Sequence, residues 1–430
     1  MIPARRTGRA NPVVGSAAAG PPRMPMSSGI PCEEGAGVLR RPAFEDFSLF
    51  VLYGSQFWFG ACMSALNPTV IEAQRDWPMT YTVVGAYPSV LAASTVVSGA
   101  GYLRCVRRWG RPRVLTATAV GVAGSGLLFA LAVGPVMLFV AAACLGLFNA
   151  PVQTAVIAAL EERGKAGRPR RLAGAALCAS VGSLTGSSFV AVMASTGIGW
   201  RAAWVVLAAA FVVLAVLLPR CTRAVGSRDD EKSGSEARLP PRYWLMATGV
   251  MAGVSGEVCI GFFAPRLSTT HGYPSAALVL ALYYSGEVCG RVAALCSSLR
   301  PSREQRALGI CLALSLTGSA VFLLPGPEPW RLIGLVVAAG GIANLFPLGV
   351  SAASGAAPGA TDRAVARVQL LVATGTFCAP VLLGTLADRT SLHTGLALVP
   401  LCFLVMAALL ATAGFLKPRA PTPTLAGRPT

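Results

Sequence analysis

The chain alternates between long apolar stretches and short polar segments from residue 47 to residue 416. A helix that crosses a bilayer needs roughly 20 mainly apolar residues. Twelve stretches meet this requirement: 47–70, 80–103, 114–133, 136–158, 173–195, 201–219, 243–265, 275–298, 307–325, 331–353, 365–387 and 393–416. The pattern therefore predicts an all-α integral membrane protein with twelve transmembrane helices.

The composition supports this prediction. Of the 430 residues, 54% are hydrophobic and 13% are charged, and the mean hydropathy is +0.62. A soluble domain carries about 25% charged residues. Most of the surface of this chain is therefore expected to face lipid.

One polar segment, residues 220–242, is the longest within the hydrophobic body and divides the predicted helices six and six. Its composition is typical of a flexible linker between two helical bundles. The residues before the first apolar stretch are rich in Gly, Pro, Ala, Ser and Arg, as in disordered tails. The predicted order is a disordered N-terminal tail (1–45), a six-helix bundle (46–219), a cytoplasmic linker (220–242), a second six-helix bundle (243–416) and a C-terminal tail (417–430).

Lysine and arginine gather on one side of the predicted helices. Alternate loops, with the tails left out, carry 21 basic residues, and the other loops carry five. Because cytoplasmic loops of membrane proteins are the basic ones, both termini and the linker are predicted to be cytoplasmic, in a multi-pass protein of the cell membrane. This distribution also explains the net charge of +18 without a nucleic-acid partner.

Several short motifs follow one another on the predicted helices. The second connection reads Arg108-Trp109-Gly110-Arg111, and the sixth helix opens with Gly199-Trp200-Arg201. The eighth helix carries Gly286-Glu287-Val288-Cys289-Gly290-Arg291, and the eleventh carries Ala379-Pro380 followed by Gly384 and Asp388. With six helices, a basic loop and six more helices, the chain resembles the major facilitator superfamily over residues 47–416.

The resemblance implies a secondary transporter with two six-helix bundles, which works as a monomer by alternating access. It assigns Arg108, Gly110 and Arg111 to the gating loop of the family. Arg107 stands where the family has an aspartate, so the salt bridge of that aspartate is not expected here.

Three charged residues are predicted to lie at membrane depth: Glu257, Glu287 and Arg291. Such residues are costly in lipid and mark transport pathways or proton relays. Both glutamates are expected near mid-membrane, with Arg291 one helical turn from Glu287. We expect Glu257 to couple proton movement to transport, and Glu287 with Arg291 to form a switchable pair. The alternative is a permanent Glu287–Arg291 ion pair that stabilises the eighth helix, with Glu257 hydrogen-bonded to hydroxyl groups or water.

Uncharged polar residues lie within three further helices. In the family, helices 1, 4, 7 and 10 line the central cavity, so the resemblance makes these residues candidates for substrate contact. Hydrogen bonding between helices is the alternative for each of them. The candidates are Tyr53, Gln56, Asn67, Asn149, Gln153 and Asn344.

The motifs of the main membrane enzymes are missing. The sequence has no histidine in the interior of a predicted helix, since His393 only begins the last stretch; it also has no P-loop and no CxxC pair, and its cysteines are scattered singly. No cofactor and no metal are therefore expected. The predicted function is proton-coupled transport of a small organic solute, with export preferred. The alternatives are an uptake permease for a sugar-like or other neutral metabolite, and a polytopic membrane enzyme.

Overall fold

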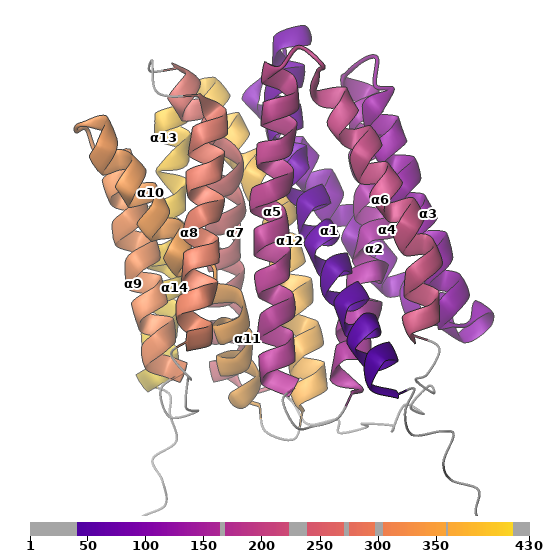
Figure 1. Cartoon of the computed structure of the whole chain (residues 1–430). Coiled ribbons are helices and arrows are strands. Elements are labelled where there is room, and N and C mark those ends of the chain that lie inside the picture. Colours follow the sequence, from indigo (N-terminus) through magenta and orange to yellow (C-terminus); the bar gives the residue numbers. More distant parts are fainter. Residues whose placement is uncertain are drawn as a thin grey trace, which may run out of the picture. The chain divides into compact units, whose positions relative to one another are not determined.

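The described part of the protein consists of α-helices joined by short connections. The computed structural model describes residues 41–163, 168–222, 239–270, 275–296, 304–357 and 360–415. Within these ranges, twelve spans are long and apolar enough to cross a membrane, which confirms the predicted number. Residues 46–430 form one compact unit, in which the long helices run side by side (Figure 1).

The first six spans are single helices, which we call the first half: α1 (Arg41–Asp76), α2 (Tyr81–Trp109), α3 (Arg111–Ala130), α4 (Pro135–Glu161), α5 (Arg168–Ser195) and α6 (Trp200–Thr222). The other six spans make up the second half: α7 (Pro241–Thr270), α8 (Ala276–Cys296), α9 (Glu304–Leu323), α10 (Glu328–Ile342), α11 (Leu345–Gly355), α12 (Thr361–Arg389), α13 (Leu392–Leu396) and α14 (Leu398–Phe415). The tenth and twelfth spans are each broken in two. Most of the predicted linker, residues 223–238, and both predicted tails except residues 41–45 lie outside the described residues.

Many helices are longer than the apolar stretches that predicted them. We expected Arg104, Arg107 and Arg108 in a loop, but α2 continues through them to Trp109. Backbone hydrogen bonding continues past the apolar region, and basic residues are favourable in the last turn of a helix. Only Gly110, with φ of +80°, separates α2 from α3. Likewise α1 begins at Arg41, inside the predicted tail, with a proline in its first turn, where proline is tolerated.

The first half is held together by a buried aromatic pair. Trp204 of α6 stacks on Phe129 of α3, with ring centroids 4.0 Å apart, and both side chains are fully buried. The indole Nε1–H of Trp204 donates a 2.8 Å hydrogen bond to the hydroxyl of Thr69 on α1. One side chain therefore joins three helices and leaves no polar atom of the indole unsatisfied.

The two halves meet along α2 and α12. Cβ atoms added at Gly85 of α2 and at Gly384 of α12 would each lie 2.3 Å from a backbone oxygen of the opposite helix. Glycine is therefore required at both positions for this close approach. The Ser89 hydroxyl donates to the carbonyl of Phe377 at 2.6 Å. We call the end of the helices where α1 ends and α2 begins the far end, and the end where α1 begins the near end.

Candidate functional site

Two carboxylates lie at the same depth in the second half. Glu257 is ten residues from the far end of the α7 span, and Glu287 is eleven residues from the far end of the α8 span. At 1.5 Å per residue, both lie about 15 Å from the far end. They are close enough for their charges to interact with each other and with Arg291. The structure thus places Glu257, Glu287 and Arg291 together, which we call the carboxylate cluster.

Neighbouring residues complete the carboxylate cluster. The hydroxyl of Tyr283, one turn before Glu287 on α8, lies close enough to the Glu287 carboxylate to interact with it. The Tyr283 ring is buried where α7 has Gly261, since a Cβ added there would lie 3.2 Å from the Tyr283 hydroxyl. Glu287 is itself buried, with 9% of its surface exposed, whereas Glu257 is partly exposed. The cluster therefore has a more accessible and a less accessible carboxylate at one depth, on two different helices.

The arginine of the carboxylate cluster does not form a close ion pair with its neighbour. Among the described side chains no ion pair joins Arg291 to Glu287, and the Nε of Arg291 is buried without a hydrogen-bond partner. The backbone beside Arg291 is fixed, because the amide of Asn344 donates a 3.0 Å hydrogen bond to the carbonyl of Gly290. Asn344 lies at the break between α10 and α11, so the broken span is tied to α8 next to the cluster.

The candidates in the first half fall into two groups. Asn149 of α4 is fully buried, and neither of its amide atoms has a hydrogen-bond partner; the Nε2 of Gln56 on α1 is also buried without one. Such groups are costly unless water or a ligand binds them. Gln153 and Tyr53 are partly exposed. The Tyr53 hydroxyl lies near Gly174 of α5, where an added Cβ would be 3.3 Å away.

Asn67 joins the two halves at the far end. Its amide nitrogen donates a 2.6 Å hydrogen bond to the carbonyl of Gly261, and its amide oxygen accepts one from Arg266 at 2.9 Å. Arg266 also donates to the Gln74 side chain at 2.9 Å and to the carbonyl of Phe262, and its guanidinium lies over the Phe262 ring. Sequence reasoning placed Arg266 in a loop, but it lies on α7 with 3% of its surface exposed. We call Asn67, Gln74 and Arg266 the far-end clasp.

A second contact between the halves was not predicted. The carboxylate of Asp388, near the end of α12, accepts hydrogen bonds from the backbone amides of Tyr81 and Thr82, both at 2.8 Å. It also accepts one from the Thr82 hydroxyl at 2.6 Å. These amides belong to the first turn of α2, where backbone N–H groups lack partners within the helix and negative charge is favourable. Asp388 of one half therefore caps a helix of the other half.

The predicted gating loop is at the near end. Arg111 forms two parallel hydrogen bonds with Glu162 at the end of α4, at 2.8 and 3.0 Å. Both side chains are about one-fifth exposed. Arg108 is exposed, and Gly110 is the single residue between the two helices. Of the three predicted residues, Arg111 makes the contact that fixes the connection.

The described residues contain no group of three or more His, Cys, Asp or Glu side chains able to hold a metal ion. The carboxylate cluster has two carboxylates and a cation, and the clasp is made of amides and a guanidinium. Carboxylates, amides and a guanidinium can exchange protons and form hydrogen bonds.

Comparison with known proteins supports the same reading of the fold. The family model described as Major Facilitator Superfamily matches residues 49–358. No curated protein sequence matches the chain significantly. Among solved structures, the chain is similar to a bacterial homolog of the human lysosomal transporter Spinster in an inward-facing, unoccupied conformation, with a TM-score of 0.63 and 14% identity over 87% of this chain and 96% of that one.

A second structure of the same bacterial homolog, in an inward-facing and occupied conformation, has a TM-score of 0.62 and 14% identity over 89% of this chain and 96% of that one. The nucleoside transporter NupG has a TM-score of 0.63 and 13% identity, over 85% of this chain and 98% of that one. These likenesses concern the fold of the spans described above.

Proposed function

Because the chain belongs to the Major Facilitator Superfamily, whose members are secondary transporters and not typically enzymes, we propose that it moves a small organic solute in exchange for, or together with, protons. The observation that carries this proposal is the carboxylate cluster of the second half. Two carboxylates at one depth, beside a guanidinium that neither of them pairs with closely, form a site at which a proton can be held. Charged groups at such depth are typical of proton relays.

Glu257 is the proposed proton carrier. It is the more exposed of the two carboxylates, and the hydroxyl of Tyr283 lies near the Glu287 carboxylate. The two negative charges repel each other, so the uptake of one proton relieves the repulsion. Loss of that proton to the other side of the membrane then restores the negative charge of Glu257 and its attraction to Arg291.

The proposed mechanism is alternating access. The far-end clasp and the Asp388 cap join the two halves at the far end. The basic residues of the near-end connections favour a cytoplasmic near end by the positive-inside rule. We therefore interpret the structure as the state closed to the outside, and both far-end contacts must separate when the protein opens outward.

The proposed substrate is neutral or amphipathic. Asn149 and Gln56 offer unsatisfied amide groups without charge, and such groups recognise hydroxyls, amides or nucleobases rather than phosphates. Export is our preferred direction. The alternative is uptake of a neutral metabolite. One observation supports this alternative: NupG, which has a similar fold, is named as a nucleoside transporter.

The proposal is tested with purified protein in phospholipid vesicles, using a panel of neutral and amphipathic solutes and an imposed pH gradient of either sign. We expect saturable flux that follows the gradient, and its sign distinguishes export from uptake. Replacing Glu257 with Gln should abolish the pH dependence while insertion into the vesicles is unchanged. The matched control is Asp76→Asn at the far end, which should keep it. Full pH-dependent flux in the Glu257→Gln variant would refute the coupling role.

A further inference from the structure

A crevice lies at the far end, away from the carboxylate cluster. It has a volume of about 460 Å³, within the range of sites for small molecules. Three helices form its walls: α1 and α5 of the first half and α8 of the second half. Nothing in the proposed transport cycle uses this crevice.

The crevice exists because α1 and α5 separate towards the far end. In mid-span these helices touch, since a Cβ at Gly182 or Gly186 of α5 would lie 1.9 or 2.3 Å from a backbone oxygen of α1. Beyond this contact, α1 presents one face of Pro68, Ile71, Glu72 and Arg75 to the crevice. The spacing of three and four residues places these four side chains on one side of the helix. Helix α5 presents a matching face of small side chains.

The walls of the crevice are apolar and reach the lipid. Ile71 packs against Ala276 and Leu280 of α8 at its floor. Val192 of α5 is 51% exposed and Leu278 of α8 is 44% exposed at its rim. Because α5 and α8 are membrane spans, we expect lipid acyl chains to contact these exposed apolar side chains.

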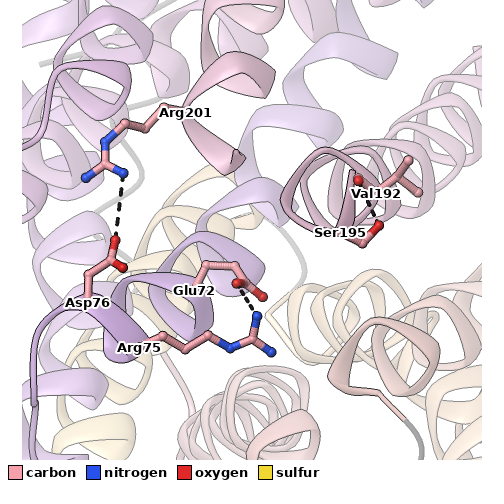
Figure 2. A network of polar contacts seen from close by, with 6 residues as sticks. All are labelled: Glu72, Arg75, Asp76, Val192, Ser195 and Arg201. Atoms are coloured by element: carbon pink, nitrogen blue, oxygen red, sulfur yellow. Dashed lines mark hydrogen bonds and ion pairs between the residues drawn. The ribbon is translucent and has the colours of Figure 1, made fainter. Parts of the chain in front are cut away.

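The mouth of the crevice carries one charge of each sign. Glu72 and Arg75 form an ion pair on the last turns of α1, with 18% and 68% of their side chains exposed. Figure 2 shows this pair on one helix and Ser195 on a neighbouring helix. The Ser195 hydroxyl donates to the carbonyl of Val192, so its own oxygen is left to accept a hydrogen bond. A carboxylate, a guanidinium and a hydroxyl oxygen thus lie at the mouth of a crevice with apolar walls.

We propose that the crevice binds a phospholipid with a zwitterionic headgroup bearing a primary ammonium, that is, a phosphatidylethanolamine of the surrounding bilayer. The ammonium donates hydrogen bonds to Glu72, and the phosphate accepts them from Arg75. The first part of one acyl chain fills the apolar part of the crevice, from Arg75 down to Pro68. These two residues are seven positions apart, which is about 10 Å along the helix. A trimethylated ammonium has no N–H to donate to Glu72. The headgroup of phosphatidylglycerol offers Glu72 only neutral hydroxyls, and it brings a negative charge without the balancing ammonium close to the Glu72–Arg75 pair.

The position of the crevice couples the lipid to the transport cycle. Its walls come from both halves, so it keeps its shape only while the far end is closed. A ligand that binds one of two states shifts the equilibrium towards that state. The bound lipid therefore stabilises the far-end-closed state, a consequence that rests on the proposed alternating access. The binding itself does not depend on it.

The test is retention of lipid by the full chain. The protein is reconstituted with equal amounts of phosphatidylethanolamine, phosphatidylcholine and phosphatidylglycerol, and the lipids that remain bound are measured by native mass spectrometry. We expect phosphatidylethanolamine to be enriched over both others. Glu72→Gln should lower this enrichment about tenfold, as expected for the loss of one charge-assisted hydrogen bond. Asp76→Asn is the matched control, because Asp76 pairs with Arg201 and does not line the crevice.

A second pair of variants tests whether an acyl chain occupies the apolar part of the crevice. Ala191→Trp places a large ring in the crevice and should abolish retention, whereas Val120→Trp on the lipid-facing side of α3 should not. Equal retention by the Glu72→Gln and Asp76→Asn variants would overturn the proposal, and so would enrichment of phosphatidylglycerol. Lipid retention is measured without any transported solute, so the two proposals are tested separately. A negative retention result would not refute proton-coupled transport, and a negative transport result would not refute lipid binding.

Discussion

The Asp388 cap gives a sharp prediction about how the halves are held closed. Its carboxylate accepts three hydrogen bonds from Tyr81 and Thr82 of the other half. Replacing Asp388 with Ala removes all three and leaves two backbone amides in the first turn of α2 without this acceptor. Loss of an acidic cap costs about 0.5–2 kcal/mol. Because Asp388 is exposed, water compensates part of the loss, and we expect about 1 kcal/mol.

The assay is hydrogen–deuterium exchange of the segment that contains Tyr81 and Thr82. A loss of about 1 kcal/mol corresponds to exchange roughly fivefold faster. The residues of the far-end clasp lie on α1 and α7. Hydrogen exchange in those two helices should therefore become faster only if the two halves separate at the far end. Thr82→Val is the control, since it removes one hydrogen bond and keeps the two backbone bonds, and it should give a smaller increase. Unchanged exchange in the Asp388→Ala variant would show that the carboxylate does not hold α2, and the reasoning would fail.

Three further predictions follow from other contacts. Arg266→Gln should lower the stability of the detergent-purified protein by about 1–3 kcal/mol, seen as a lower melting temperature, because the shorter side chain cannot reach both the buried amide oxygen of Asn67 and the partly exposed one of Gln74. A wild-type melting curve would contradict this. Arg111→Lys should destabilise the protein by about 1 kcal/mol, through loss of the paired hydrogen bonds with Glu162, while Arg108→Lys on the exposed face leaves melting unchanged. Gly182→Ala should abolish accumulation of folded protein in the membrane, since its Cβ would lie 1.9 Å from the carbonyl oxygen of Phe57, whereas Gly54→Ala, with open space around it, should accumulate normally.

The sequence was sufficient for the fold because lipid imposes a strict condition. A span is either a strand of a closed barrel, about ten residues long, or a helix of about 20 mainly apolar residues. The twelve continuous apolar stretches visible in the sequence have the length of helices. The helix ends were less predictable. The helical backbone continues past the apolar residues into water, so α2 carries basic residues that we expected in a loop. The breaks at Asn344 and Ala397 each lie three residues before a proline, Pro347 or Pro400, which has no N–H for the carbonyl four residues earlier. The sequence carried this signal, but the spans were predicted from hydropathy alone.

The candidate site was predicted in part. Glu257, Glu287 and Arg291 were found because charge within an apolar stretch is conspicuous. Arg266 and Asp388 were missed because each lies near the end of a span, where a charged residue ordinarily meets water. Their partners, Asn67 and the first turn of α2, are about 200 and 300 residues away in the sequence. A contact at such separation is fixed by the packing of the halves, which a single sequence does not display.

The broken tenth span gives the two halves different mechanical properties. Its counterpart in the first half, α4, is one continuous helix from Pro135 to Glu161, whereas α10 and α11 meet at a break where Asn344 is tied to α8. A continuous helix moves as one body along its whole length, whereas a helix with a break can bend at the break. Spectroscopic probes on α4 should therefore report rigid-body tilting. Probes on α11 should report local bending as well, so the same overall motion would give different signals in the two halves.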